Sequence, residues 1–162
     1  MPALAEDFRD VMAGVCTPVS VVTTMDGARP HGTTVSAFSS LSMRPPMVLV
    51  ALDRNSELLA LVRRSGRFGL NVLACGQSGL AKRFAGKGNA KFDGVEWAPA
   101  NGLPRLPGVT AWLACSVAEV VEGGDHLVVL GEVEAAQRGL APPLTYHART
   151  FGTHSRREEI AG

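Results

Sequence analysis

The stretch that decides the fold is Gly32-Thr33-Thr34-Val35-Ser36-Ala37-Phe38-Ser39-Ser40-Leu41-Ser42, which is followed by Arg44-Pro45-Pro46. Small hydroxyl-bearing residues are concentrated here in a segment that predicts a β-strand, and the Pro-Pro pair gives a rigid stop. A strand of this composition offers many short donors and acceptors but little side-chain bulk. It suits a flat ligand with polar edges, such as a flavin ring, although threonine and serine also occur in strands that bind nothing.

Other strands are expected on both sides of this segment. Residues 18–24 are rich in β-branched side chains, and Asp26-Gly27 then predicts a hairpin whose returning strand is the hydroxyl-rich segment. A type I′ turn fits this dipeptide because such a turn needs positive φ at both central positions. Further strands are expected over residues 47–52, 67–73, 109–121 and 126–135. The last two meet at Gly123-Gly124-Asp125.

Three helices and one long loop complete the chain. Residues 6–15 predict a short amphipathic helix that ends near Gly14, with apolar side chains at helical spacing at Phe8, Val11, Met12 and Val15. Ser56 begins a second helix that ends with two arginines and Gly66. Residues 78–84 predict a third helix. The segment 86–107 is rich in glycine and proline and long for a compact domain, so we expect it to be functional or mobile.

Short strands with hairpin signals and few helices predict a mainly β fold with flanking helices. The arrangement that fits is a closed antiparallel barrel with Greek-key-like connections, because closure removes the exposed edges of valine-rich strands. The 162 residues favour a single domain. We expect its core over about residues 8–152 and a short flexible C-terminal tail over residues 153–162.

Charge and composition exclude several classes of partner. A net charge of +1 leaves no excess of positive charge for nucleic acid or an anionic membrane surface. No apolar run approaches the roughly 18 residues that span a bilayer, and the N-terminus lacks the features of a secretion signal. Three widely spaced cysteines predict neither a disulfide framework nor a metal site, and favour a reducing cytoplasm. The absence of GxGxxG and Walker sequences argues against Rossmann and P-loop folds.

The motifs, taken in order, resemble the flavin reductase-like family with the FMN-binding split-barrel fold. The resemblance covers about residues 8–152 and rests first on the hydroxyl-rich strand with Pro45-Pro46. Later segments that carry it are Asn55-Ser56, Phe68-Gly69-Leu70-Asn71-Val72-Leu73, Arg83-Phe84-Ala85, Gly124-Asp125-His126, Gly131-Glu132-Val133 and Pro143-Leu144-Thr145-Tyr146-His147.

This resemblance implies a homodimer that binds FMN or FAD in a groove near the subunit interface. NADH or NADPH passes a hydride to the flavin, and the reduced flavin diffuses to a partner monooxygenase. Two alternatives stay open at this stage. One is a flavin-retaining binding or electron-transfer protein. The other is a split-barrel enzyme with another task, either an oxidase of a pyridoxine-type substrate or a reductase with another acceptor such as a cobalamin cofactor.

The hydroxyl-rich strand and the start of the second helix are expected to hold the flavin. Alternation along one strand would place Thr34, Ser36, Phe38, Ser40 and Ser42 on one face. The free N–H groups and dipole of the helix start attract a phosphate. The residues assigned to the cofactor in these two places are Thr34, Val35, Ser36, Ala37, Ser40, Ser42, Leu52, Arg54, Asn55 and Ser56.

The resemblance assigns roles further along the chain. It implies that Arg83 helps to hold the flavin phosphate, and that His126 positions the nicotinamide or balances charge on the reduced ring. Tyr146 and His147 are expected to close over the cofactor from the same or the other subunit. The segment 86–89 is expected to be a mobile loop over the groove. His31 and His154 are expected on the surface, and Cys75 and Cys115 as small core residues.

Overall fold

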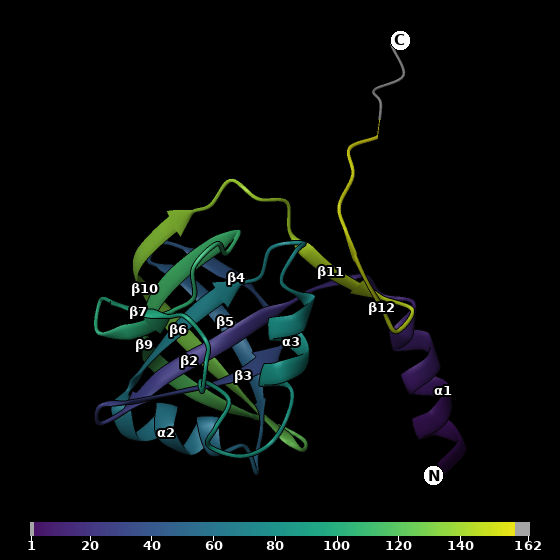
Figure 1. Cartoon of the computed structure of the whole chain (residues 1–162). Helices are drawn as coiled ribbons and strands as arrows, with labels where there is room; N and C mark the ends of the chain where they lie inside the picture. Colours follow the sequence, from purple (N-terminus) through teal and green to yellow (C-terminus); the bar gives the residue numbers. More distant parts are fainter. Residues whose placement is uncertain (1, 158–162) are drawn as a thin grey trace.

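The computed structural model describes residues 2–157, in which there are three helices and twelve strands (Figure 1). The helices are α1 (Pro2–Ala13), α2 (Glu57–Ser65) and α3 (Ser78–Phe84). The strands are β1 (Thr17–Pro18), β2 (Ser20–Asp26), β3 (Arg29–Val35), β4 (Phe38–Met43), β5 (Pro46–Asp53), β6 (Arg67–Val72), β7 (Ala98–Ala100), β8 (Leu103–Arg105), β9 (Ala111–Gly123), β10 (His126–Arg138), β11 (Leu144–His147) and β12 (Thr150–Thr153). Residue 153 is therefore part of a strand, and residues 158–162 of the expected tail lie outside the described residues.

Seven strands form one antiparallel sheet in the order β3-β2-β6-β9-β10-β5-β4. Strands β3 and β4 are its two edges, yet the chain passes directly from one to the other through Ser36 and Ala37 (Figure 1). The Ala51 N–H donates to the Ala37 carbonyl at 2.9 Å, which holds this crossing against β5. The chain itself thus joins the edges of the rolled sheet, because no strand pairing within residues 2–157 links β3 to β4. The predicted mainly β split-barrel fold is confirmed.

The prediction of one continuous strand over the hydroxyl-rich segment is wrong. The segment is divided at Ser36-Ala37. Its first part, β3, pairs with β2, and its second part, β4, pairs with β5 at the opposite edge of the sheet. The pairing of β4 with β5 also shifts register between Ser40 and Ser42. Both irregularities interrupt the alternation of side chains, so the hydroxyl residues do not share one face. The preceding hairpin is present, with positive φ at Gly27 only, which is the type II′ pattern rather than type I′.

Apolar residues pack on both faces of the sheet. Neighbouring residues of β2 illustrate the alternation, because Val22 belongs to one buried cluster and Val21 to the other. The first cluster includes Leu58 and Val62 of α2, whose limits agree with the prediction: Ser56 caps its start and Gly66 adopts the left-handed conformation at its end. The second cluster includes Phe84 of α3. The two helices are thereby fixed against the barrel.

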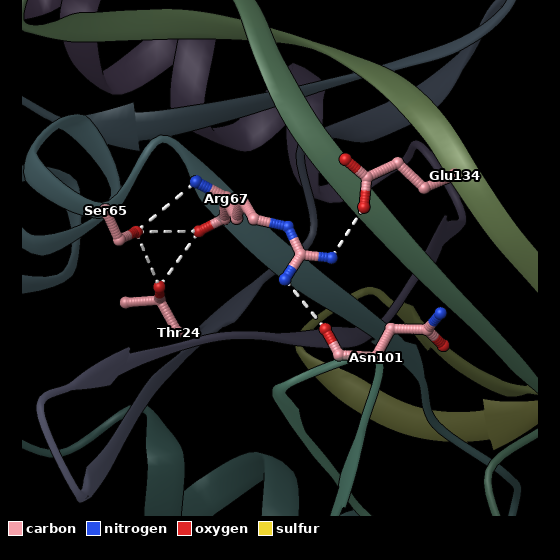
Figure 2. A network of polar contacts seen from close by, with 5 residues as sticks. All are labelled: Thr24, Ser65, Arg67, Asn101 and Glu134. Atoms are coloured by element: carbon pink, nitrogen blue, oxygen red, sulfur yellow. Dashed lines mark hydrogen bonds and ion pairs between the residues drawn. The ribbon is translucent and has the colours of Figure 1, made fainter.

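A polar network holds the β7–β8 hairpin against the barrel (Figure 2). Arg67 donates to the Asn101 carbonyl at 2.7 Å and to Glu134 of β10 at 2.5 Å. The Thr24 hydroxyl lies 2.9 Å from that of Ser65, and both donate to the Arg67 carbonyl. The segment 86–107, expected as an irregular loop, therefore contains a short hairpin with defined contacts.

Helix α1 lies away from the barrel, beside a small sheet of strands β1, β11 and β12 (Figure 1). The Ala148 N–H donates to the Ala13 carbonyl at 2.8 Å, and Arg149 forms an ion pair with Asp10 at 2.7 Å. These contacts fix α1 to the turn between β11 and β12. None of its side chains is buried within the chain. No helix within residues 2–157 has the length and apolar character needed to cross a membrane.

Candidate functional site

The main cavity opens where the chain crosses between the two edges of the sheet. It has a volume of about 800 Å³, within the range of roughly 300–1,000 Å³ that is typical of small-molecule sites. Its walls come from β3, the crossing itself, the end of β5, the start of α2, the loop after α3 and the first residue of β10. The division of the hydroxyl-rich segment into β3 and β4 therefore forms part of the cavity wall and also joins the two edges of the sheet.

Eight of the predicted site residues line this cavity. They are Thr34, Val35, Ser36, Ala37, Leu52, Asn55, Ser56 and His126. Five others, Ser40, Ser42, Arg54, Arg83 and Tyr146, do not line it. That any of them contacts a flavin stays a prediction.

The crossing supplies backbone hydrogen-bond donors that have no partner among the described residues. Ser36 and Ala37 lie outside the strands, and neither of their N–H groups donates a hydrogen bond within residues 2–157. Two backbone donors at the wall of a cavity fit the carbonyl and ring-nitrogen acceptors at the edge of a flavin. The hydroxyl of Thr34 serves another purpose, because it donates to the Ala81 carbonyl of α3 at 2.6 Å. It therefore fixes the helix that borders the cavity.

The start of α2 forms a second wall of the cavity. The Ser56 hydroxyl accepts from the Leu59 N–H at 3.4 Å, and the Asp53 carboxylate accepts from the Asn55 N–H at 2.7 Å. These bonds shape the turn between β5 and the helix. Glu57 also lines the cavity, so this wall carries a carboxylate beside the helix dipole.

Arg54 supports the turn between β9 and β10 rather than facing the cavity. Its Nε donates to the Gly124 carbonyl at 2.7 Å, and it pairs with Glu122 at 3.3 Å. Its own N–H donates to the Asp125 carbonyl at 2.9 Å. The predicted phosphate ligand is therefore occupied in holding the turn that precedes His126.

His126 reaches the cavity from the first position of β10, opposite Asp53 in the register with β5. Its Nδ1 donates to the Asp125 carboxylate at 2.7 Å. This hydrogen bond, with the charge of the ring beside it, holds the pKa of Asp125 below its usual range. The ring orientation is thereby fixed by the adjacent residue, and Nε2 is left for a ligand.

Two residues that line the cavity, His31 and Lys91, were not predicted as site residues. His31, expected on the surface, is only 8% exposed and lines the cavity, and burial lowers its pKa. Strand alternation from Val35 through Thr33 to His31 is the sequence signal that indicates this placement. Lys91, from the loop after α3, also lines the cavity, and no periodic pattern marks it. The segment 86–88, expected over the groove, contributes to the same wall.

The C-terminal residues and the cysteines differ in part from expectation. Tyr146 packs against Phe151 at 5.2 Å between ring centroids, in the small sheet away from the cavity. Neither it nor His147 covers the cavity of its own chain. Cys75 is exposed, so its assignment to the core is wrong, whereas Cys115 is buried and burial raises its pKa to about 12. Within the described residues no cluster of three or more His, Cys, Asp or Glu side chains is placed to hold a metal.

Comparison with known proteins identifies the family to which this fold belongs. Residues 12–155 match the flavin reductase like domain. The reductase subunit HsaB of a flavin-dependent monooxygenase from Mycobacterium tuberculosis is 40% identical over 129 residues, which cover 79% of this chain and 69% of the relative. The NADH:riboflavin 5'-phosphate oxidoreductase of Streptomyces pristinaespiralis is 37% identical over 153 residues, covering 91% and 87%.

Solved structures give the same result. The Streptomyces globisporus NADH:FAD oxidoreductase SgcE6, in complex with NAD and FAD fragments, superposes with a TM-score of 0.89 at 30% identity, covering 99% of this chain and 98% of that one. The chain belongs to the flavin reductase-like family. This membership confirms the predicted enzyme class, an NAD(P)H-dependent flavin reductase.

Proposed function

We propose that the cavity binds FMN or FAD and then the reduced nicotinamide, and that the reduced flavin leaves for a partner monooxygenase. The observation that carries this proposal is the cavity of about 800 Å³ at the split of the barrel, with free donors at Ser36 and Ala37. The bound flavin accepts a hydride from the nicotinamide, and that chemistry belongs to the two cofactors. The protein binds and orients them.

The lining residues fit a ligand that must be released. The N–H groups of Ser36 and Ala37 each supply one neutral hydrogen bond, worth about 0.5–1.5 kcal/mol net. Leu52 gives an apolar surface beside them, and it is almost fully buried. No covalent attachment is needed for such a site, and moderate affinity allows the reduced flavin to leave.

The test of this function is anaerobic mixing of the protein with flavin and either NADH or NADPH. We expect the yellow absorbance of the flavin to bleach with at least one of the two nicotinamides. Absence of bleaching with both would contradict the proposal. The same experiment decides between FMN and FAD.

His126 is proposed to position the nicotinamide. We expect His126→Ala to raise the KM for reduced nicotinamide about 10-fold, the effect of losing roughly one good polar contact, and to change the KM for flavin about 2-fold or less. Steady-state kinetics with each substrate varied measures both. His154→Ala is the matched control, because that residue is exposed and lies outside the cavity. Equal increases in the two KM values would contradict this placement.

We also propose that the protein is a cytoplasmic homodimer whose whole chain forms one domain. The apolar face of α1 supports the dimer: Leu4, Phe8 and Val11 are 69%, 64% and 70% exposed. Contacts to the β11–β12 turn hold α1 in place, so these side chains cannot fold back onto their own barrel. Pairing with a second copy about a two-fold axis covers the same face on both chains.

Introducing negative charges on the apolar face of α1 tests the proposed dimer. We expect the wild-type protein to have twice the mass of one chain by light scattering, and the double variant Phe8→Asp/Val11→Asp to have the mass of one chain, because two buried carboxylates oppose association. Arg9→Asp is the control on the same helix. A wild-type protein with the mass of one chain would contradict the proposal.

A further inference from the structure

Arg83, in the last turn of α3, is bonded to backbone rather than free to meet a ligand. Its Nε donates to the Lys91 carbonyl at 2.6 Å, and its Nη2 donates to the Ala90 carbonyl at 3.3 Å and to the Asp93 carbonyl. The Asp93 N–H closes the same turn by donating to the Ala90 carbonyl at 3.1 Å. The turn over residues 90–93 is therefore folded around one guanidinium.

The turn over residues 90–93 places one side chain in the core and another at the cavity wall. Phe92 is buried and packs on Phe84 at 4.8 Å between ring centroids. Lys91 lines the cavity, with its Nζ 3.2 Å from the Gly32 carbonyl and 3.1 Å from the Phe84 carbonyl. The direction of the lysine thus depends on the turn that Arg83 holds.

The Lys91 ammonium has a donor and a charge to offer a ligand. An ammonium carries three donors, and two are used by these carbonyls. Lys91 forms no ion pair within the described part of the chain. Burial lowers its pKa, because its charge is partly removed from water and only Glu57 opposes that effect. An anion in the cavity would compensate this charge.

We propose that Arg83 is a positioning residue that holds Lys91 at the cavity wall, and that Lys91 makes the cavity prefer flavins bearing a phosphate over riboflavin. The inference rests on the proposed flavin site. Arginine suits this position because its planar guanidinium spreads its donors in a fixed fork that reaches three carbonyls of one turn, whereas the donors of a lysine all lie on one atom. The family resemblance implies a direct contact of Arg83 with the phosphate; the proposal assigns that contact to Lys91, because Arg83 bonds the carbonyls of the turn.

The test is the ratio of the Kd for riboflavin to the Kd for FMN, both measured by quenching of flavin fluorescence. The variants are Lys91→Met, Arg83→Lys and the double variant Arg83→Lys/Lys91→Met. Lys82→Met is the matched control, since Lys82 neighbours Arg83 on α3 but does not line the cavity. Arg83→Lys keeps the positive charge while losing the fork. Thermal unfolding of each variant reports whether it is folded.

For the wild-type protein we expect a ratio of about 10 or more, the usual size of one charge-assisted hydrogen bond. Lys91→Met should bring the ratio close to one while the Kd for riboflavin changes less than about 2-fold. Arg83→Lys should lower the ratio at least about 3-fold, and the double variant should match Lys91→Met. Lys82→Met should leave the ratio unchanged.

Any of the following results would overturn the inference: an unchanged ratio in Lys91→Met, an unchanged ratio in Arg83→Lys, or a double variant with a lower ratio than Lys91→Met. Equal weakening of both flavins by Arg83→Lys would show a purely structural role and also overturn it. Reduction of riboflavin by NADH in the same samples tests the proposed function separately. Its success alongside an unchanged ratio would leave the flavin reductase in place and remove only this inference.

Discussion

Ala37→Trp should abolish flavin binding while leaving the barrel folded. Ala37 is exposed at the crossing between β3 and β4 and lines the cavity, so an indole placed there occupies the volume that a flavin ring would need. We expect the Kd for FMN to rise at least about 100-fold, equivalent to about 3 kcal/mol. Fluorescence quenching by the protein measures the binding, and thermal unfolding measures the fold.

The matched control is Ser39→Trp. Ser39 is exposed on β4, two residues away, and does not line the cavity. We expect this variant to bind FMN with its affinity unchanged. If Ala37→Trp bound FMN as tightly as the wild-type protein does, the flavin site would not be in this cavity.

Asn71→Ala should give the largest loss of stability among single polar substitutions. Asn71 is fully buried on β6, where its Oδ1 accepts from the Leu106 N–H at 2.8 Å and its Nδ2 donates to the Val21 carbonyl at 3.2 Å. The same Nδ2 lies 3.4 Å from the Pro104 carbonyl of β8. Removing the amide leaves buried backbone groups without partners. We expect a loss of about 3 kcal/mol in the free energy of unfolding.

Thermal unfolding and urea titration measure this loss. For a chain of this size we expect the midpoint temperature to fall by about 10 °C. Asn89→Ala is the control, because Asn89 is exposed in the loop after α3. A shift no larger than that of the control would show that the buried amide does not hold the β7–β8 segment to the barrel.

The sequence predicted the limits of a helix correctly where residues at or near the ends of that helix mark them. The limits of α2 follow from the Ser56 cap and from Gly66, which has a φ of 71° at the end of the helix. The limits of α3 were also predicted correctly. In both helices the signal lies within a few residues of the feature it determines.

Features that depend on contacts between distant parts of the chain could not be predicted from such local signals. The division at Ser36-Ala37 arises because β3 pairs with β2 while β4 pairs with β5, and composition alone does not distinguish two strands from one. Arg54 was assigned to phosphate because it is a cation beside a helix start, and Arg83 because the family resemblance implies that role. Their carbonyl partners, at the β9–β10 turn and the 90–93 turn, become visible only when the chain is folded.

The sequence therefore predicted the backbone segments that line the cavity better than it predicted the basic side chains that line it. The crossing, Leu52, Asn55, Ser56 and His126 all meet at one cavity. The side chains that line it include, beside His126, also His31 and Lys91, which come from the middle of a strand and from an irregular loop. The alternation of side chains along β3 marks His31, whereas no spacing marks Lys91 as part of a site.

The central claim is that this protein reduces flavin and releases it. The most direct test is anaerobic oxidation of NADH or NADPH by a catalytic amount of purified protein with a large excess of free FMN or FAD. The account predicts that many equivalents of flavin are reduced per protein chain. Reduction of a single equivalent, or of none, would contradict it and favour a protein that retains its flavin or one that serves a different acceptor.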